Sequence, residues 1–555
     1  MGLSLERRIG QSDGSPRMGC RSRTLCFPAE RMAAMKRLDL LKQMSFGSQV
    51  AEDEVSALAS YFVETNQWAR IANGEIDIIR GEKGAGKSAI YSLLMTRSGD
   101  FFDRGILLVA AENPRGATVF KELVADPPTS EQEFTVLWKL YVLTIVAHQL
   151  REYDVRGAQA EKLYRALEDA KLLEKEFSLV GVLRSVHEYA RSLVRVEALE
   201  GGIKIDPVTQ MPSGITGRIV LKEPSAELKR SFGLISIDNL FGVLNEALQA
   251  RGLKVWVLLD RLDVAFVENH ALEANALRAL IRVYADIRNR DEISLKIFLR
   301  EDIWKRITER GFREASHLIR FVVLEWTQPA LLNLIMRRLL NNAALIEEFK
   351  IERNAVLQDV QRQQTLFYRC FPAQVEQGPQ KAPTFKWLLA RCADGTGKTA
   401  PRELIHLLNC ILEQETKRLE QGSAPAPDDK LFDRSVFKAA LPTVSNARLN
   451  QYLYAEYASQ RPYVAKLEGQ KAEQTADSLA NLWKISRDAA ITKAEELVEL
   501  GFFEKREKSD QTTFWVPFLY RDALHLVQGR AEGDDDDDSA DNDDETGLFR
   551  EMRRR

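Results

Sequence analysis

The sequence has few cysteines, no long apolar run and almost no net charge, and each absence excludes a class of protein. Its five cysteines, an odd number without a C-x-x-C pair, argue against a disulfide framework and indicate a reducing compartment. No apolar run approaches the ~20 residues needed to cross a bilayer, and the N-terminus lacks the apolar core of a secretory signal. A net charge of −3 gives no overall field that would attract nucleic acid. We therefore expect a cytoplasmic protein with no membrane partner.

One motif stands out from this ordinary background. Residues 81–88 read G-E-K-G-A-G-K-S, a full match to the phosphate-binding loop G-x-x-x-x-G-K-[ST]. Glycines allow backbone angles that a Cβ would obstruct, and the exposed N–H groups can wrap a phosphate at the start of the next helix. The expected nucleotide-binding residues are Gly81, Gly84, Ala85, Gly86, Lys87, Ser88 and Ala89.

The surroundings of this motif support it. Residues 75–80 alternate apolar and polar residues like a half-buried strand, and residues 88–95 are apolar at helical spacing. Lys87 would reach the β- and γ-phosphates, as a catalytic residue, and the Ser88 hydroxyl would bind Mg²⁺. No [NT]KxD tetrapeptide for guanine follows in a fitting place, so the motif favours ATP over GTP.

A carboxylate that completes this site is expected at the end of another strand. Asp260 follows the apolar run 255–259 and is predicted to hold Mg²⁺ through water, the alternative being a surface turn. Many ATPases place Glu next, to orient the attacking water, but here the residue is Arg261 and the next acid is Asp263. If Asp263 polarises water, hydrolysis should be slow and suit a switch; a structural role as a turn cap is the open alternative.

Several arginines are candidates for contact with the γ-phosphate. Arg300 ends the strand-like run 294–300, on the side of a parallel sheet where ligands collect, unless it pairs with Glu301 or Asp302 instead. Arg402 starts a helix that could swing it onto the nucleotide, or it is a plain helix-start residue. An arginine finger, a side chain that reaches into a neighbouring subunit, could be Arg310, Arg313 or Arg320, and the sequence does not discriminate among these three. The look-alike D-G-T-G-K-T (394–399) lacks the first glycine and a preceding strand, which predicts a loop.

Strand-like and helical segments alternate through the first part of the chain. This pattern predicts right-handed βαβ crossovers and a three-layer α/β P-loop NTPase fold of the AAA+/ASCE type, with a helical lid and a C-terminal winged helix. A hairpin is expected within 202–222. The expected organisation is a disordered extension (1–34, with the true start at Met35 or Met44 or an organellar transit peptide as alternatives), an ATPase domain (35–326) with a helical and hairpin insertion (about 131–222), a lid (327–430), a winged helix (431–530) and an acidic disordered tail (531–555).

Four separated motifs carry a resemblance to a known family. They are F-G-S-Q-V-A-E-D-E (46–54), Y-F-V-E-T-N-Q-W (61–68), G-E-K-G-A-G-K-S-A-I-Y-S-L-L (81–94) and P-R-E-L-I-H-L-L-N (401–409). Over about residues 44–530 the chain resembles a poorly characterised family of bacterial P-loop ATPases, which is similar to origin-recognition-type AAA+ ATPases and has STAND-like features. The resemblance implies that residues 61–68 lie near the adenine, with Trp68 or Tyr61 lining the pocket, and suggests DNA-associated or antiviral roles.

Three functions are compatible with these residues. The first is an ATP-binding switch with slow, Mg²⁺-dependent hydrolysis. The second is an ATP-gated DNA-binding protein that uses the winged helix, although its basic residues are interleaved with acidic ones. The third is a signalling or defence ATPase that forms a homo-oligomer and recruits an effector protein, since the chain shows no nuclease, protease or deaminase motif of its own.

Overall fold

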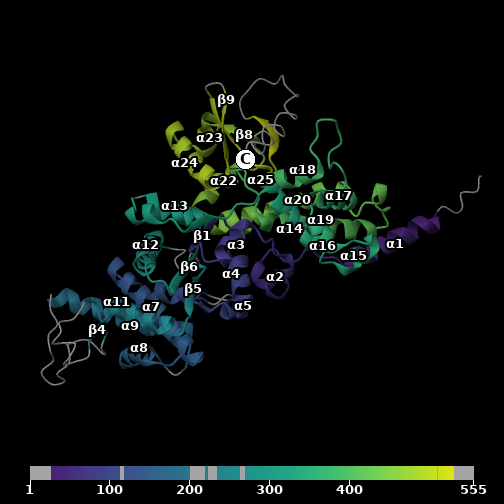
Figure 1. Cartoon of the computed structure of the whole chain (residues 1–555). Coiled ribbons are helices and arrows are strands. Elements are labelled where there is room, and N and C mark those ends of the chain that lie inside the picture. Colours follow the sequence, from purple (N-terminus) through teal and green to yellow (C-terminus); the bar gives the residue numbers. More distant parts are fainter. Residues whose placement is uncertain are drawn as a thin grey trace, which may run out of the picture.

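A computed structural model gives the fold of the chain (Figure 1). It describes residues 27–112, 118–174, 176–200, 219–222, 234–262, 269–309, 311–508 and 511–530. Asp263, Arg310 and the acidic tail lie outside these ranges, as do residues 1–26. The first helix, α1 (Phe27–Gln43), begins inside the segment 1–34 that the sequence predicts to be disordered. Within the described ranges, no helix combines the length and the apolarity that a bilayer crossing requires.

The first part of the chain is built on a parallel sheet of five strands. Side by side, they are β2 (Ile106–Ala110), β5 (Lys254–Leu259), β6 (Ile293–Arg300), β1 (Ile78–Gly81) and β7 (Phe321–Val323). These strands are almost entirely buried and rich in Val, Ile and Leu, as a parallel sheet covered on both faces requires. Because all strands run the same way, their carboxyl ends meet at one edge of the sheet.

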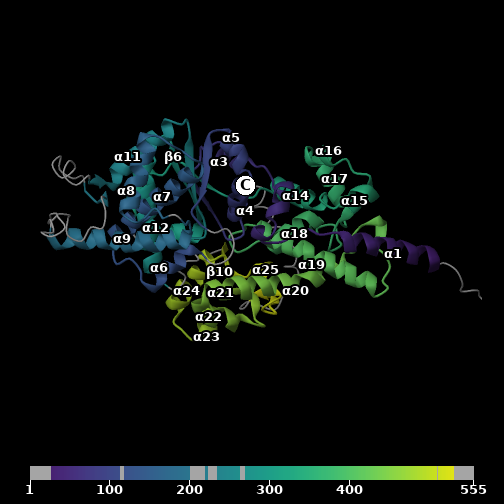
Figure 2. The same ribbon diagram turned by 90° about the horizontal axis from the view of Figure 1, so that it is seen from below.

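Helices cover both faces of this sheet, which gives three layers (Figures 1 and 2). One face, with Leu108, Trp256 and Phe298, packs against α2 (Val55–Tyr61), α3 (Asn66–Ala72), α4 (Lys87–Thr96) and α5 (Ser98–Asp103). The other face packs against α7 (Glu131–Glu152), α9 (Leu179–Glu200), α11 (Ile237–Gln249), α12 (His270–Ile287) and α13 (Glu301–Glu309). The predicted three-layer α/β class is therefore confirmed.

The expected insertion forms the far side of this second layer. Helix α7 is largely buried between α9 and α12, and α8 (Ala158–Asp169) packs on α11. Two short strands, β3 (Ile219–Val220) and β4 (Ile235–Ser236), pair in parallel. Most of the predicted hairpin, up to residue 218, lies outside the described residues. Ile219 and Val220, near its end, pair with β4 and not with an earlier strand of the hairpin.

After β7 the chain becomes helical, as expected. Thr327 caps the next helix by accepting a hydrogen bond from the Ala330 N–H, and Pro329 occupies its first turn. The helices are α14 (Gln328–Leu339), α15 (Ala343–Phe349), α16 (Arg353–Leu357), α17 (Val360–Cys370), α18 (Thr384–Cys392), α19 (Pro401–Glu420) and α20 (Ser435–Ala447). Helix α1 packs against α15 and α19. Residues 394–399 form a tight turn, as the sequence predicts for this look-alike.

The C-terminal part contains a second sheet, with strand order β11-β8-β10-β9. Its elements are β8 (Lys471–Thr475), α23 (Ala476–Trp483), α24 (Arg487–Glu499), β9 (Glu504–Lys508), β10 (Gln511–Trp515), α25 (Phe518–Arg521) and β11 (Val527–Arg530). Helices followed by the antiparallel pair β9–β10 have the order expected of a winged helix, an interpretation that stays a prediction. Figure 1 shows β8 and β9 of this sheet in the upper part of the view, beside α23 and α24.

The helical part and the C-terminal part share one hydrophobic core. A single cluster of buried side chains runs from Leu331 of α14 through Leu408 of α19 and Phe437 of α20 to Tyr520 of α25. Residues 421–429, which the sequence marks as a linker between domains, connect α19 to α20, and these two helices pack on each other. The lid and the C-terminal part therefore have no separate cores at this boundary.

Candidate nucleotide-binding site

The phosphate loop leaves β1 and enters α4 with the backbone that the motif predicts. Gly84 and Gly86 have φ of +85° and +100°, in the left-handed region that favours glycine, and Gly86 immediately precedes the helix. The Lys87 Nζ donates to the carbonyl oxygens of Gly81 and Glu82, at 2.8 and 3.0 Å. The lysine thus lies folded over its own loop, with its ammonium group at the mouth of the cradle.

The predicted residues at the strand ends come together with this loop. Arg300 is the register partner of Gly81, so it stands directly beside the first residue of the loop. Asp260 follows β5, the strand next to β6, and its side chain is 5% exposed. Arg261 has φ of +56°, which turns the chain sharply after Asp260 and is uncommon for a residue with a Cβ. Asp263 lies outside the described residues.

Arg300 is held by residues from two parts of the chain. It donates to both carboxylate oxygens of Asp302, at 3.0 and 2.9 Å, and to Glu456 in α21 (Tyr454–Glu456), at 2.7 Å. The Tyr457 hydroxyl donates to Asp302 at 2.8 Å and accepts a bond from Arg300. Although burial works in the other direction, Arg300 lowers the pKa of the Asp302 carboxyl. Pairing with Asp302, one of the two alternatives open from the sequence, is therefore present.

The phosphate loop itself is tied to the same glutamate. Lys83 forms an ion pair with Glu456, which also binds Arg300. Burial alone would raise the pKa of Glu456, yet Lys83 and Arg300 lower it. Glu456 thus bridges the loop and the end of β6, and it belongs to the segment that leads into the C-terminal sheet. Nothing in the local sequence around Glu456 marks it for this role.

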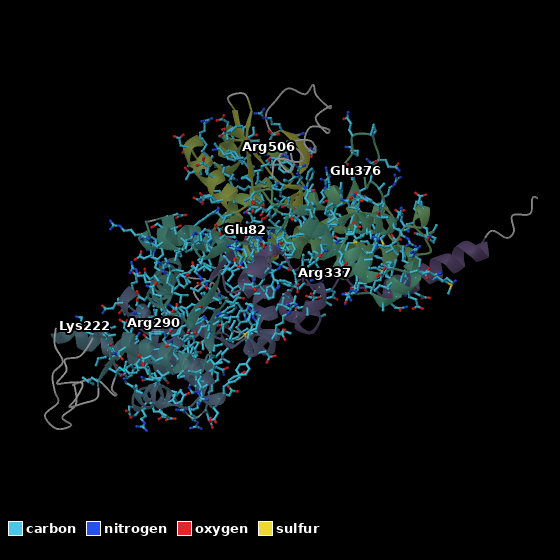
Figure 3. All side chains as sticks on the ribbon, in the orientation of Figure 1. Glu82, Lys222, Arg290, Arg337, Glu376 and Arg506 are labelled. Carbon is cyan, nitrogen blue, oxygen red and sulfur yellow. The ribbon has the colours of Figure 1, made fainter. Side chains whose placement is uncertain are left out.

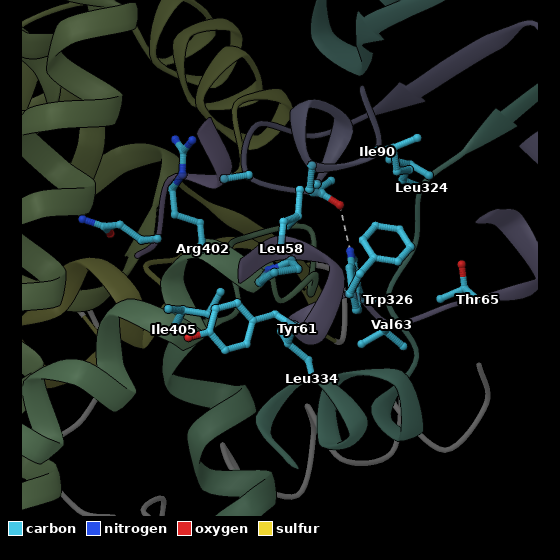
Figure 4. A pocket seen from close by; sticks show the side chains of 18 of the residues that line it. Leu58, Tyr61, Val63, Thr65, Ile90, Leu324, Trp326, Leu334, Arg402 and Ile405 are labelled. Carbon is cyan, nitrogen blue, oxygen red and sulfur yellow. Dashed lines mark hydrogen bonds between the residues drawn. The ribbon is translucent and has the colours of Figure 1, made fainter. Parts of the chain in front are cut away.

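A cavity of about 90 Å³ opens beside the loop (Figure 4). Its walls come from the phosphate loop and α4, from the segment around α2, from the chain after β7 and from α14 and α19. Figure 4 shows Arg402 and Ile405 of α19 on one side and Trp326 on the other, where the Trp326 indole N–H donates to the Ala85 carbonyl at 2.8 Å. Apolar lining includes Leu58, Tyr61, Phe62, Val63, Ile90, Leu324, Leu334 and Ile405. An apolar pocket next to a phosphate cradle is the shape that a nucleoside triphosphate needs.

Tyr61 lines this cavity, whereas Trp68 does not. The Trp68 ring is buried and packs edge-on against Phe62, with ring centroids 5.0 Å apart, and the Arg97 guanidinium lies 5.6 Å from the centre of the Trp68 ring. Phe62 therefore lines the wall of the cavity, whereas Trp68, one of the two residues proposed for this wall, packs against Phe62. Tyr61 ends α2 and Trp68 lies in α3, so which of the two lines the cavity depends on how these helices pack.

The four motifs of the family resemblance meet around the cavity. Asn409 of the last motif accepts from the Phe46 N–H at 3.2 Å and donates to the Gly47 carbonyl at 2.7 Å. Glu54 of the first motif makes a buried ion pair with Arg338 of α14 at 3.0 Å, and that guanidinium lies 4.6 Å from the centre of the Tyr61 ring. Segments far apart in the sequence therefore build one wall.

Helix α19 touches the phosphate loop directly. A Cβ at Gly84 would come within 3.1 Å of the Arg402 Cβ, so only a glycine fits there without displacement. The Arg402 Nε is buried and has no hydrogen-bond partner within the described residues. The next residue, Glu403, pairs with Arg448 at 2.7 Å. Arg402 thus lines the cavity, and its contact with a bound phosphate stays a prediction.

The other arginines offered as fingers lie elsewhere. Arg320 binds Asp77 at 2.6 Å, at the amino end of β1 and so at the opposite edge of the sheet from the loop. Asp77 also binds the fully buried Lys296, whose pKa is lowered by burial. Arg313 lies in a short helical turn before β7, and Arg310 lies outside the described residues.

Sequence reasoning did not single out one acid at this edge, Glu112. It follows β2, the neighbour of β5, and its side chain is 1% exposed. Burial raises the pKa of Glu112 to about 7, against the effect of a hydrogen bond from Thr118. Asp260 and Arg261 both act electrostatically on this carboxyl. The strand-like run 105–112, which ends in this acid, was the signal that could have revealed it.

The donor set suits Mg²⁺ delivered with a nucleotide. Within the described ranges, no group of three or more His, Cys, Asp or Glu side chains forms a metal cage of its own. By prediction the Ser88 hydroxyl would bind Mg²⁺ and the Asp260 carboxylate would hold it through water, since Mg²⁺ is commonly bound by one or two such groups together with substrate phosphates and water. The two residues therefore fit the ion that the motif implies.

The strand order and the loop define the class of this protein. A parallel sheet in which the loop-bearing strand β1 is separated from the Asp260 strand β5 by one further strand, with helices on both faces, is a P-loop NTPase fold. The helices that follow β7 and lie beside the loop correspond to the helical lid that the sequence predicts for this class.

Comparison with known proteins gives distant structural likenesses. No family model and no curated protein matches the chain. It is similar to the Walker-type ATPase paby2304 of Pyrococcus abyssi (11% identity, TM-score 0.37, covering 84% of this chain and 96% of that one). It is also similar to the Aeropyrum pernix ORC2 protein in its ADPNP–ADP complexes (12% identity, TM-score 0.33, covering 90% and 93%). Neither likeness assigns a site residue in this chain.

Proposed function

We propose that this protein is an ATP-binding switch with slow, Mg²⁺-dependent hydrolysis. The observation that carries the proposal is the double engagement of Glu456 with Lys83 of the phosphate loop and with Arg300 beside it. Both cations lie where phosphates would bind, and both are held by the segment leading into the C-terminal sheet. A bound triphosphate would compete with Glu456 for these two cations. Nucleotide binding would therefore change the contacts of the segment that leads into the C-terminal sheet. Figure 3 shows Glu82, the neighbour of Lys83, close beneath that part of the molecule.

The size of the cavity supports a change of shape on binding. Sites for small-molecule ligands usually enclose roughly 300–1,000 Å³, whereas this one measures about 90 Å³. Since α19 lies against Gly84, the simplest way to admit a nucleotide is for α19 to move away from the loop and to close again over the phosphates. Arg402 would then contact the γ-phosphate.

In the bound state each group has a separate task. The loop N–H groups and Lys87 would hold the phosphates, and the apolar wall around Tyr61 and Phe62 would take the base. Ser88 and Asp260 would hold Mg²⁺, which neutralises charge on the β- and γ-phosphates. The residue after Asp260 is Arg261, so the acid usually found there is missing, which favours slow turnover.

Single-turnover hydrolysis by the full chain tests this proposal. With protein in excess over labelled ATP, we expect ADP to form slowly with Mg²⁺ and not in EDTA, because the phosphates then lack their counter-ion. A parallel equilibrium measurement with ATP and GTP should show tighter binding of ATP. The proposal fails if the chain binds neither nucleotide.

The role of Glu456 gives a second prediction. In Glu456→Gln the competition for Lys83 and Arg300 is weakened, so ATP should bind more tightly. Since these ion pairs are only partly buried, the effect should be roughly 1 kcal/mol, or ~fivefold in the dissociation constant. Titration with a fluorescent ATP analogue measures it, and Glu499→Gln, an exposed glutamate of α24, is the control. Unchanged or weaker binding in Glu456→Gln would show that the bridge does not compete with phosphate.

The charges of the C-terminal part favour a protein partner over DNA. Basic side chains of α24 and β9 are engaged by acidic neighbours: Arg487 by Asp477, Lys493 by Glu496, Lys505 by Glu495 and Arg506 by Glu504. A surface that follows DNA phosphates needs cations free to replace counter-ions. We therefore place protein docking, including assembly into a homo-oligomer, ahead of DNA loading as the output of the switch.

A further inference from the structure

Glu112 and Asp260 stand side by side at the edge of the sheet that bears the phosphate loop. In the parallel pair β2–β5, Ala110 is the register partner of Leu258, and the Ala111 N–H donates to the Leu258 carbonyl at 3.0 Å. Two residues further along each strand come Glu112 and Asp260. Both residues lie just past the ends of their strands, so they stand at the same carboxyl edge of the sheet as the phosphate loop.

A contact with α4 fixes Glu112 near the loop. The Tyr91 hydroxyl donates to the Glu112 carbonyl oxygen at 3.1 Å, and Tyr91 lies one helical turn after Lys87. The pKa of Tyr91 is raised by burial, and Asp260 and Glu112 act in the same direction. Glu112 is therefore joined both to the Asp260 strand and to the helix that begins with Lys87 and Ser88.

The two oxygens of the Glu112 carboxylate have different surroundings. Oε2 accepts hydrogen bonds from the Thr118 hydroxyl at 2.8 Å and from the Val119 N–H at 3.3 Å. Oε1 is buried and has no hydrogen-bond partner within the described residues. A buried carboxylate oxygen without a donor is costly, and such groups concentrate where a reaction uses them.

We propose that Glu112 is the catalytic base of ATP hydrolysis, in place of the acid missing after Asp260. The proposal rests on the ATPase function proposed above. One carboxylate oxygen, held by Thr118 and Val119, fixes the side chain, while Oε1 accepts a proton from the attacking water.

The step balances without any further reactant. The water oxygen forms a bond to the γ-phosphorus while its proton passes to Glu112 Oε1. The bond between that phosphorus and the β–γ bridging oxygen breaks, and its electron pair stays on ADP. Glu112 then returns the proton to phosphate or to solvent, which leaves ADP and inorganic phosphate.

Glu112→Gln separates this role from a structural one. The glutamine carbonyl can still accept the bonds from Thr118 and Val119, so the fold and ATP binding should be retained, but the amide cannot take a proton. We expect single-turnover hydrolysis of bound ATP to fall about 100-fold or more, the usual contribution of a general base. The matched control is Glu122→Gln, whose carboxylate pairs with Arg184 on the surface.

The outcomes distinguish this inference from its rivals. Hydrolysis by Glu112→Gln at the wild-type rate, with ATP bound, overturns the assignment. A 100-fold loss in Asp263→Asn with no loss in Glu112→Gln assigns the base to Asp263 instead. Should Glu112→Gln not fold or not bind ATP, Glu112→Asp keeps a carboxylate but withdraws it by one methylene, and a wild-type rate there overturns the proposal. Failure of the wild-type chain to bind ATP would instead refute the proposed function.

Discussion

Lys87→Ala is expected to lower ATP hydrolysis by about 10²–10³-fold, the usual effect of removing one donor that stabilises charge in the transition state. The ammonium group of Lys87 lies at the mouth of the loop, 2.8 and 3.0 Å from the Gly81 and Glu82 carbonyls. A triphosphate in the cradle would place oxygens within its reach. Since the ground-state phosphates are also bound by Lys87, ATP affinity should fall as well.

Single-turnover hydrolysis, combined with a direct binding titration, separates the two effects. The control is Lys398→Ala, which removes the lysine of the look-alike 394–399, a tight turn on the surface beside Glu82. This variant should hydrolyse ATP like the wild type. Unchanged hydrolysis in Lys87→Ala, or an equal loss in Lys398→Ala, would contradict the assignment of the phosphate loop.

The sequence predicts this site best where the chemistry is contiguous. Gly84, Gly86 and Lys87 lie within one turn between a strand and a helix, and the motif fixes both their residue types and their backbone angles. Arg300 and Asp260 were also found, because a polar residue after a buried strand must lie at the carboxyl edge of a parallel sheet. For these residues local pattern and fold class are sufficient.

The residues that sequence reasoning missed depend on contacts between distant segments. Glu112 becomes a candidate only once β2 is known to neighbour β5, because strand order is set by packing and not by the run of residues in either strand. Glu456 lies in a short helix with no motif, and it becomes a candidate only through its contacts with Lys83 and Arg300, which lie 373 and 156 residues earlier. The shared core of the lid and the C-terminal part likewise depends on how α19 and α20 pack.

A second large effect is expected from Arg448→Met, which should lower the free energy of unfolding by about 3–5 kcal/mol. Arg448 is 8% exposed and lies in the π-helical turn between α20 and α21. It donates to Glu403 at 2.7 Å and to the Tyr520 hydroxyl at 3.1 Å, and its guanidinium lies over the Tyr452 ring. Although burial works against the charged form, Tyr520 and Glu403 raise the pKa of Arg448.

Methionine fills much of the space of arginine but leaves the Glu403 carboxylate buried without its cation. The double variant Arg448→Met with Glu403→Met removes both charges and should recover most of the lost stability, because a buried pair contributes little net free energy. Chemical denaturation of the wild type, both single variants and the double variant measures the coupling. A loss below about 1 kcal/mol in Arg448→Met would mean that water reaches Glu403.

Since Glu403 adjoins Arg402 and faces Gly84, an unpaired carboxylate there should also repel phosphate, so ATP binding should weaken in Arg448→Met and return in the double variant. Stability and nucleotide affinity would then change together, as expected if the lid, the loop and the C-terminal part act as one unit.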